Sequence, residues 1–220
     1  MPILKARELF DFSHTKARPW LEAIDYGHEI LKKIPEIIET IAQGLGDDYE
    51  QVRPRVWIAK DAAVSPLATV EAPTIVGHRT EIRPGAYVRG AALIGDDCVI
   101  GNSTEVKNAI LFDGVQIPHY NYVGDSILGH RAHMGAGAIA SNFRADHGSI
   151  TLRCEGEEIK TAMQKLGAMV GDFAEIGCNS VLCPGAIVGR KSIIYPLSRV
   201  RGTIAESKIF KSEREIIDVK

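Results

Sequence analysis

The sequence predicts an all-β coil of short parallel strands, a β-helix, with a helical cap at its start and one long inserted loop. Apolar, mostly β-branched residues recur at every sixth position through most of the chain, and glycine often follows them. Neither a helix nor an ordinary strand gives a period of six, because their side-chain periods are about 3.6 and 2. Residues 1–50 instead show the spacing of an amphipathic helix.

This first segment, residues 1–50, is expected to form the cap. Its apolar residues follow the three-and-four spacing of a helix: Ile24, Gly27, Leu31, Ile34, Ile38 and Ile41. Pro19 and Pro35 each suit a first helical turn, so we expect two helices with a break near Lys33. We expect the apolar stripe to pack on the first coil, because an open coil end exposes strand edges.

The repeat itself occupies residues 51–205. One unbroken series of apolar positions, six residues apart, contains Ile58, Val64, Val70, Val76, Ile82, Val88, Ile94, Ile100, Val106 and Phe112. If three such units close one turn, residues about 18 apart stack in an internal column, as repeats stack in a solenoid. Such a column would contain Ile58, Val76, Ile94 and Phe112. The register slips by one residue at Ile117 and again at Leu128.

Between Met134 and Val170 the period disappears and the sequence becomes polar. We expect residues of about 143–167 to leave the coil as an inserted loop, and residues 206–220 to form a tail. Loops inserted into repeat folds often carry the binding site. The alternative is a tolerated surface excursion.

Composition restricts the partners of the protein. The net charge is −2 and basic residues are scattered, which disfavours a nucleic-acid partner. No apolar run approaches the roughly 20 residues of a membrane span, and the first residues show no signal sequence. We therefore expect a cytoplasmic protein without a membrane partner. The four cysteines form no CxxC pair and suit reduced, packed thiols.

Polar residues gather in region 102–146, where the repeat becomes irregular. Among them, His119 is a candidate general base, because an imidazole titrates near neutral pH and can accept a proton from an amine or hydroxyl. The alternative is an exposed histidine at a corner of the coil.

The run from Arg83 to Phe143 resembles the acetyltransferase domain of bifunctional glucosamine-1-phosphate acetyltransferase/N-acetylglucosamine-1-phosphate uridylyltransferases. The segments RPGA, GN, EVKNA, HYNYVGDS, GAG and SNF occur in that family's order. The wider similarity covers about residues 54–205, and its later part is more like archaeal and clostridial relatives with a sugar-nucleotide pyrophosphorylase domain. The resemblance implies a left-handed parallel β-helix of hexapeptide repeats, assembled as a homotrimer, with acetyl-CoA as acyl donor.

The resemblance also implies roles for particular residues. These are His119 as general base, Arg83 and Lys107 as cations for the sugar phosphate, Tyr122 and Asn142 as sugar-binding residues, and Ala136 as a contact of the coenzyme. Glu105 lies in the same polar strand and would orient or neutralise the cluster.

The expected activity is acetyl transfer from acetyl-CoA to an amino-sugar phosphate, without a metal. His133, Phe143 and Arg144 stand where the family has an asparagine, a tyrosine and a nearby lysine, which leaves the acceptor sugar open. We expect no nucleotidyltransferase activity on this chain, because it has no glycine-rich phosphate loop.

Two other functions remain open. A trimeric scaffold or sensor would bind sugar phosphates without catalysis. A zinc enzyme similar to the γ-class carbonic anhydrases would use histidines such as His78, His119, His130 and His133.

Overall fold

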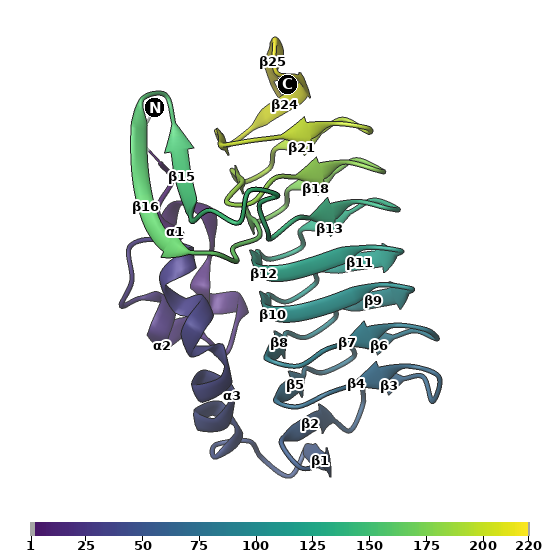
Figure 1. Ribbon diagram of the computed structural model, residues 1–220. Helices are drawn as coiled ribbons and strands as arrows, with labels where there is room; N and C mark the ends of the chain where they lie inside the picture. The colour runs from purple at the N-terminus through teal and green to yellow at the C-terminus, as the bar shows by residue number, and fades with distance from the viewer. Residues whose placement is uncertain (1–2, 220) are drawn as a thin grey trace.

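A computed structural model describes residues 3–219 as a coil of stacked short strands with helices along one side (Figure 1). Strands of successive turns pair in parallel, for example β2 (Val56–Ala59) with β5 (Thr74–Val76) and β5 with β8 (Ala92–Ile94). This confirms the predicted all-β coil with a helical segment and an inserted loop. Each turn contributes one strand segment to each of three faces.

The strands of the first face, beginning with β2, β5 and β8, continue through later turns of the coil. They are followed by the second halves of β10 (Glu105–Leu111) and β12 (Tyr122–Leu128), then by β17 (Met169–Val170), β20 (Ile187–Val188) and β23 (Thr203–Ile204). The second face consists of β3 (Ala63–Val64), β6 (Glu81–Ile82), β9 (Val99–Asn102), β11 (Gln116–His119), β13 (His133–Met134), β18 (Glu175–Ile176), β21 (Ile193–Ile194) and β24 (Lys208–Ser212). The third face consists of β4 (Thr69–Val70), β7 (Tyr87–Val88), the first parts of β10 and β12, β14 (Ile139–Ala140), β19 (Val181–Leu182) and β22 (Arg199–Val200).

The interior of the coil is a set of aliphatic columns, one from each face. On the first face, Ile58 pairs with Val76 and Val76 with Ile94, as predicted. The prediction is wrong for the fourth member, Phe112, because Leu111 pairs with Ile94 in its place. The register slips one six-residue unit earlier than the sequence analysis expected, between Val106 and Leu111. Phe112 therefore leaves the interior of the coil, and its ring centroid lies 5.2 Å from that of Phe10.

The N-terminal segment is more broken than two helices. Within residues 3–219 it forms α1 (Ala6–Leu9), α2 (Arg18–Leu21) and α3 (Ile34–Ala42), with 3₁₀ turns η1 (Phe12–His14) and η2 (Gly27–Lys33). Pro19 and Pro35 lie in the first turns of α2 and α3, because proline there removes no helical hydrogen bond. The predicted break at Lys33 is confirmed, since η2 ends there and α3 begins at the next residue.

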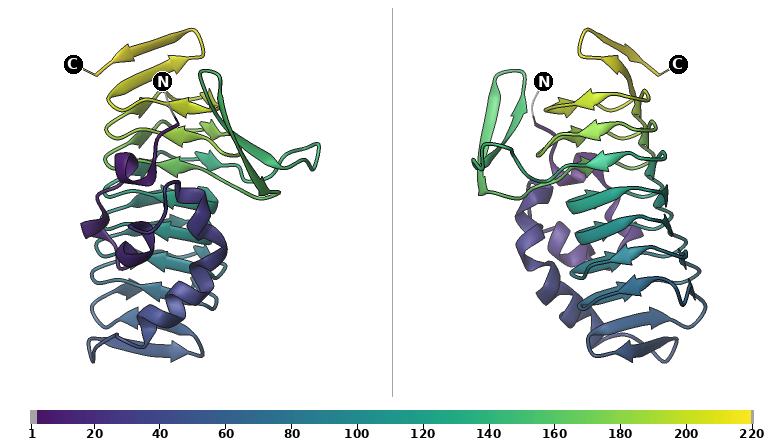
Figure 2. Two further views of the ribbon diagram at one scale, coloured as in Figure 1. Left: turned by 90° about the vertical axis from the view of Figure 1, so that its left-hand side faces the viewer. Right: turned by 45° about the vertical axis from the view of Figure 1, so that its right-hand side comes forward.

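These helices lie along the first face across several coils, rather than over the first coil (Figure 2). The reason is a second apolar column on the outside of that face. Its buried members are Ile75, Leu93, Ile110, Ile127, Met169 and Ile187. They pack in one cluster with helical residues such as Ile34, Ile37 and Ile38, and burying each aliphatic side chain contributes about 1.5–3 kcal/mol.

Antiparallel strands close both ends of the coil. At one end β1 (Tyr49–Arg53) pairs with β2, and at the other β25 (Glu215–Asp218) pairs with β24. Both pairings satisfy backbone groups that a terminal coil would otherwise present as an open edge.

The polar insertion forms an antiparallel hairpin of β15 (Ile150–Cys154) and β16 (Glu157–Met163) on the side of the coil (Figure 1). Strand β15 lies against the last coils, where Thr203 Oγ1 donates to Arg153 O at 3.1 Å. The hairpin packs beside the N-terminal segment, and the Ile3 backbone N–H donates to Glu157 Oε2 at 2.7 Å. The division at residues 1–50, 51–205 and 206–220 stays a prediction. None of the helices formed by residues 3–219 is long and apolar enough to cross a membrane.

Candidate functional site

A buried carboxylate, Asp125, organises the polar residues of the third face. Its Oδ2 accepts from Lys107 Nζ at 3.4 Å and from the Asn142 amide, and its Oδ1 accepts from Asn108 Nδ2 at 2.8 Å. Residues from three successive coils thus meet at one side chain: Lys107 and Asn108 from one coil, Asp125 itself, and Asn142 from the next. The structure brings together two residues that the resemblance implied, Lys107 and Asn142.

The local backbone explains why asparagine and aspartate occupy this corner. Asn108 and Asp125 lie in consecutive coils, and both have positive φ values, of 47° and 49°. Asparagine and aspartate tolerate this left-handed conformation better than other residues with a side chain. The sharp turn between the third and first faces therefore also places amide and carboxylate groups beside the Lys107 ammonium.

Arg89 is a cation that the sequence analysis missed. Its backbone N–H donates to Val106 O at 2.8 Å, which places Arg89 one coil before Lys107 at the same corner. Its Nη1 lies 2.8 Å from Glu105 Oε1. Arg89 and Lys107 are one full turn apart in the sequence, and this spacing predicts that they stack at one corner. The resemblance implied Arg83, in the RPGA segment, as the second cation instead.

Arg83 lies elsewhere, just after β6 at the edge of the second face. Its Nη2 lies 2.9 Å from Glu81 Oε2, and within residues 3–219 this is its one ion pair. The structure does not bring Arg83 into contact with Lys107 or Asp125, and its role stays a prediction.

Tyr122 begins β12 and lies between the two corners of the third face. Its phenol packs over Gly124, where an added Cβ would lie 2.5 Å from Tyr122 Oη, so glycine leaves the room that the ring needs. Burial, together with the Glu105 and Asp125 carboxylates, raises the pKa of Tyr122, while a hydrogen bond with Asn142 opposes the rise. The phenol is therefore protonated at neutral pH and can donate a hydrogen bond.

His119 ends β11 at the corner between the second and third faces, and it is exposed. Its backbone is fixed by Asn121 Oδ1, which accepts from His119 N at 3.1 Å. Among the described residues, no side chain or backbone group bonds to the His119 imidazole. Gln116 pairs with His133 on the next coil, and the same register places Ala136 one coil beyond His119.

We name the group of His119, Tyr122, Lys107, Asp125 and Arg89 the polar strip. It runs across the third face from the His119 corner to the Lys107 corner. The strip combines an unengaged imidazole, a protonated phenol and two cations. This set can accept a proton at one end and bind an anion at the other.

The three other histidines of the zinc hypothesis make contacts elsewhere. His78 lies between Asp48 and Asp61, with contacts of 2.9 and 2.8 Å, and His133 Nδ1 lies 2.7 Å from Glu175 Oε2. The His130 ring stacks on His14 with centroids 3.7 Å apart. The part of the chain that the structure describes contains no group of three or more side chains arranged to hold a metal ion.

Comparison with known proteins finds similar sequences over the segment that carries the strip. A family model described as the GMPPB C-terminal domain matches residues 70–162. A bifunctional sugar-1-phosphate nucleotidylyltransferase/acetyltransferase of Sulfurisphaera tokodaii is 32% identical over 172 residues, which are 77% of this chain and 43% of that protein. The bifunctional protein GlmU of Methanococcus vannielii is 38% identical over 137 residues, 62% of this chain and 33% of that protein. The chain is thus similar in sequence to part of these bifunctional proteins.

The chain spans less than half the length of the two relatives just named. The matched residues 70–162 contain the whole polar strip and also Arg83, Ala136 and Asn142. Among solved structures, the acetyltransferase domain of PglB from Neisseria gonorrhoeae with acetyl coenzyme A aligns with a TM-score of 0.35 and 16% identity, over 83% of this chain and 63% of that one.

Proposed function

We propose that this chain transfers an acetyl group from acetyl-CoA to the amine of a sugar phosphate, and that it acts as a homotrimer in the cytoplasm. The observation that carries the proposal is the unengaged His119 imidazole at one end of a strip that ends in two cations. The names of the relatives, which include an acetyltransferase, support the same reaction. The partners are small molecules rather than nucleic acid or membrane.

In the proposed reaction the sugar amine attacks the thioester carbonyl while His119 accepts a proton from the nitrogen. A C–N bond forms, the C–S bond breaks, and the proton passes from His119 to the departing thiolate, so that CoA leaves as the thiol. No acyl-enzyme is needed. Ala136, one coil beyond His119, has a small side chain that leaves space for the pantetheine of the donor.

At the other end of the strip, Arg89 and Lys107 bind the phosphate of the acceptor. Each cation has a carboxylate partner, Glu105 and Asp125, so the pairs are neutral without substrate. Arg89 uses one of its five donors on Glu105, and the Lys107 contact with Asp125 is long at 3.4 Å. Both cations therefore keep donors for phosphate oxygens, and Tyr122 and Asn142 contact the sugar between the two ends.

A thiol-release assay tests this function. The chain is given acetyl-CoA with a panel of amino-sugar 1-phosphates, amino-sugar 6-phosphates and the same sugars without phosphate. We expect release of free thiol that needs an acceptor with both an amine and a phosphate. Binding of the sugar phosphates without any thiol release would instead support a non-catalytic sensor.

Asp125 provides a prediction about binding. The substitution Asp125→Asn keeps the shape of the side chain but removes the charge that holds Lys107. We expect the KM for the phosphorylated acceptor to rise about tenfold, because Lys107 and Asn142 lose the carboxylate oxygen that orients both of them toward the acceptor, with a smaller change in kcat. Steady-state kinetics measure both constants. The matched control is Asp97→Asn, which removes an exposed partner of Arg79 outside the strip; equal effects of the two variants would contradict the role of Asp125.

A further inference from the structure

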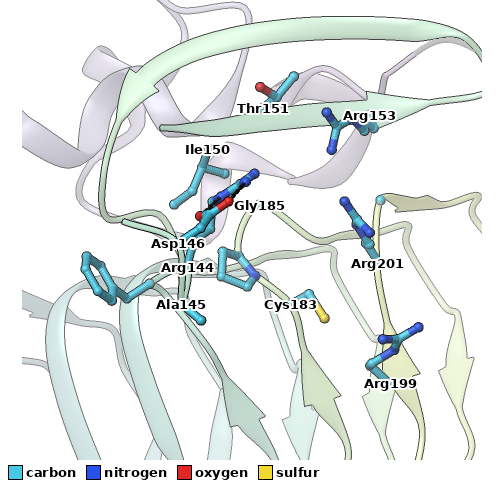
Figure 3. Close-up of a pocket in the computed structure, with 13 residues that line it drawn as sticks. Arg144, Ala145, Asp146, Ile150, Thr151, Arg153, Cys183, Gly185, Arg199 and Arg201 are labelled. Atoms are coloured by element: carbon cyan, nitrogen blue, oxygen red, sulfur yellow. Dashed lines mark hydrogen bonds and ion pairs between the residues drawn. The ribbon is translucent and has the colours of Figure 1, made fainter. Parts of the chain in front are cut away.

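A second cavity lies between the inserted hairpin and the last coils, and we name it the hairpin pocket (Figure 3). Its volume is about 500 Å³, within the range of small-molecule sites. Strand β15 forms one wall and the corners that follow β19 and β22 form the other. The hairpin approaches these corners closely because both contain glycine: a Cβ at Gly185 would lie 2.8 Å from Ile150, and one at Gly202 would lie 3.1 Å from Arg153 O.

Arginines line both walls of the hairpin pocket. Arg144 and Arg153 come from the insertion, and Arg199 and Arg201 come from the coil, as Figure 3 shows. The single carboxylate in the lining is that of Asp146. The lining therefore carries an excess of positive charge, which attracts an anion.

The four guanidinium groups are not equally engaged. Arg144 pairs with Asp146, Arg153 Nε lies 2.7 Å from Glu158 Oε1, and Arg199 Nη2 lies 2.8 Å from Glu213 Oε1. Among the described residues, Arg201 has no ion pair and is exposed to the pocket. Arg199 begins β22 and Arg201 directly follows it, and both side chains line the pocket.

The rest of the lining is mostly apolar. Phe143, Ile150 and Pro184 contribute its larger side chains, Thr151 adds one hydroxyl, and Phe143 is 40% exposed. An aromatic group can pack against these side chains while arginines on two walls bind phosphate oxygens, since the planar guanidinium fork matches a phosphate. We propose that the hairpin pocket binds a nucleotide through its diphosphate group, with Arg201 as the main contact.

The hairpin pocket begins next to Asn142, on the same corner of the coil as Asp125, but it is separate from the His119 end of the polar strip, where acyl transfer is proposed. Arg201 and Cys183 belong to the corner between the third and first faces, in coils beyond Asp125. His119 and Ala136 lie at the other corner of the third face. A nucleotide in the hairpin pocket would contact neither of these two residues, so its binding does not depend on the proposed reaction.

Calorimetric titration of the full chain tests the proposal, with UDP, inorganic pyrophosphate and uridine as probes. We expect UDP and pyrophosphate to bind and uridine alone to bind much more weakly. Arg201→Gln should weaken the binding of UDP about tenfold or more, because one charge-assisted contact is lost. Arg53→Gln, an equal charge change on β1 at the far end of the coil, should leave the affinity unchanged.

Three results would overturn the proposal. They are failure of both UDP and pyrophosphate to bind, equal binding by the wild-type chain and Arg201→Gln, and competitive displacement of UDP by CoA, which would assign the pocket to the acyl donor. Retention of UDP binding by His119→Ala is expected. That result would separate this site from the proposed acyl transfer, whichever of the two proposals fails.

Discussion

Replacement of His119 by alanine should lower kcat for acetyl transfer by about 10²–10⁴, the usual contribution of a positioned general base. The imidazole is exposed and makes no bond to another described residue, so its removal costs the fold little. The thiol-release assay measures kcat, and circular dichroism with sedimentation checks that the fold and the assembly are kept.

Two controls sharpen this experiment. Added imidazole should restore part of the lost rate to His119→Ala, because a free base can enter the space left by the side chain. His147→Ala removes another exposed histidine, on the inserted segment, and should leave kcat within about twofold of the original value, as expected for a surface change. Undiminished turnover by His119→Ala would exclude this residue as the base.

Replacement of Gly101 by alanine should destabilise the whole coil. Gly101 lies on β9, and an added Cβ would lie 1.5 Å from the carbonyl oxygen of Pro118 on the next coil. A backbone atom cannot move aside without breaking the stacking of β9 on β11. We expect a loss of at least about 3 kcal/mol in the free energy of unfolding, the upper end of overpacking costs. Urea denaturation measures this loss.

Gly44→Ala is the matched control. The nearest atom to an added Cβ there, Ile41 O, is 3.7 Å away, which is an ordinary contact. The free energy of unfolding should change by no more than about 1 kcal/mol. If Gly101→Ala were as stable as Gly44→Ala, the close stacking of these two coils would be wrong.

The repeat was predictable because every coil fills its interior with the same aliphatic residue types at the same spacing. The register slip at Leu111 was harder to predict, because Leu111 and Phe112 are both apolar: Phe112 keeps the six-residue spacing from Val106, whereas Leu111 keeps it to Ile117. Pairing with Ile94 distinguishes them only in three dimensions. The position of the helices had a signal in the sequence, since Ile75 and Leu93 precede inner residues and are themselves apolar, which requires a cover on the outside of the coil.

The candidate site was predictable in part. Lys107 and Asn142 were implied by the resemblance, and the structure brings both onto Asp125. Asp125 and Arg89 were missed because their importance follows from the stacking of coils and not from their neighbours in the chain. The hairpin pocket was not predictable at all, since Arg153 and Arg201 meet only after the insertion folds back on the coil.

The helices along the first face have a consequence for cooperativity. A stack of repeats that contact only their neighbours tends to unfold coil by coil from its ends. Here one apolar cluster joins Ile38 and its helical neighbours to side chains from Ile75 on an early coil to Ile187 on a late one. An end coil therefore gains little conformational entropy by unfolding unless the N-terminal helices detach from the first face as well. We therefore expect the molecule to unfold in one cooperative transition and not coil by coil.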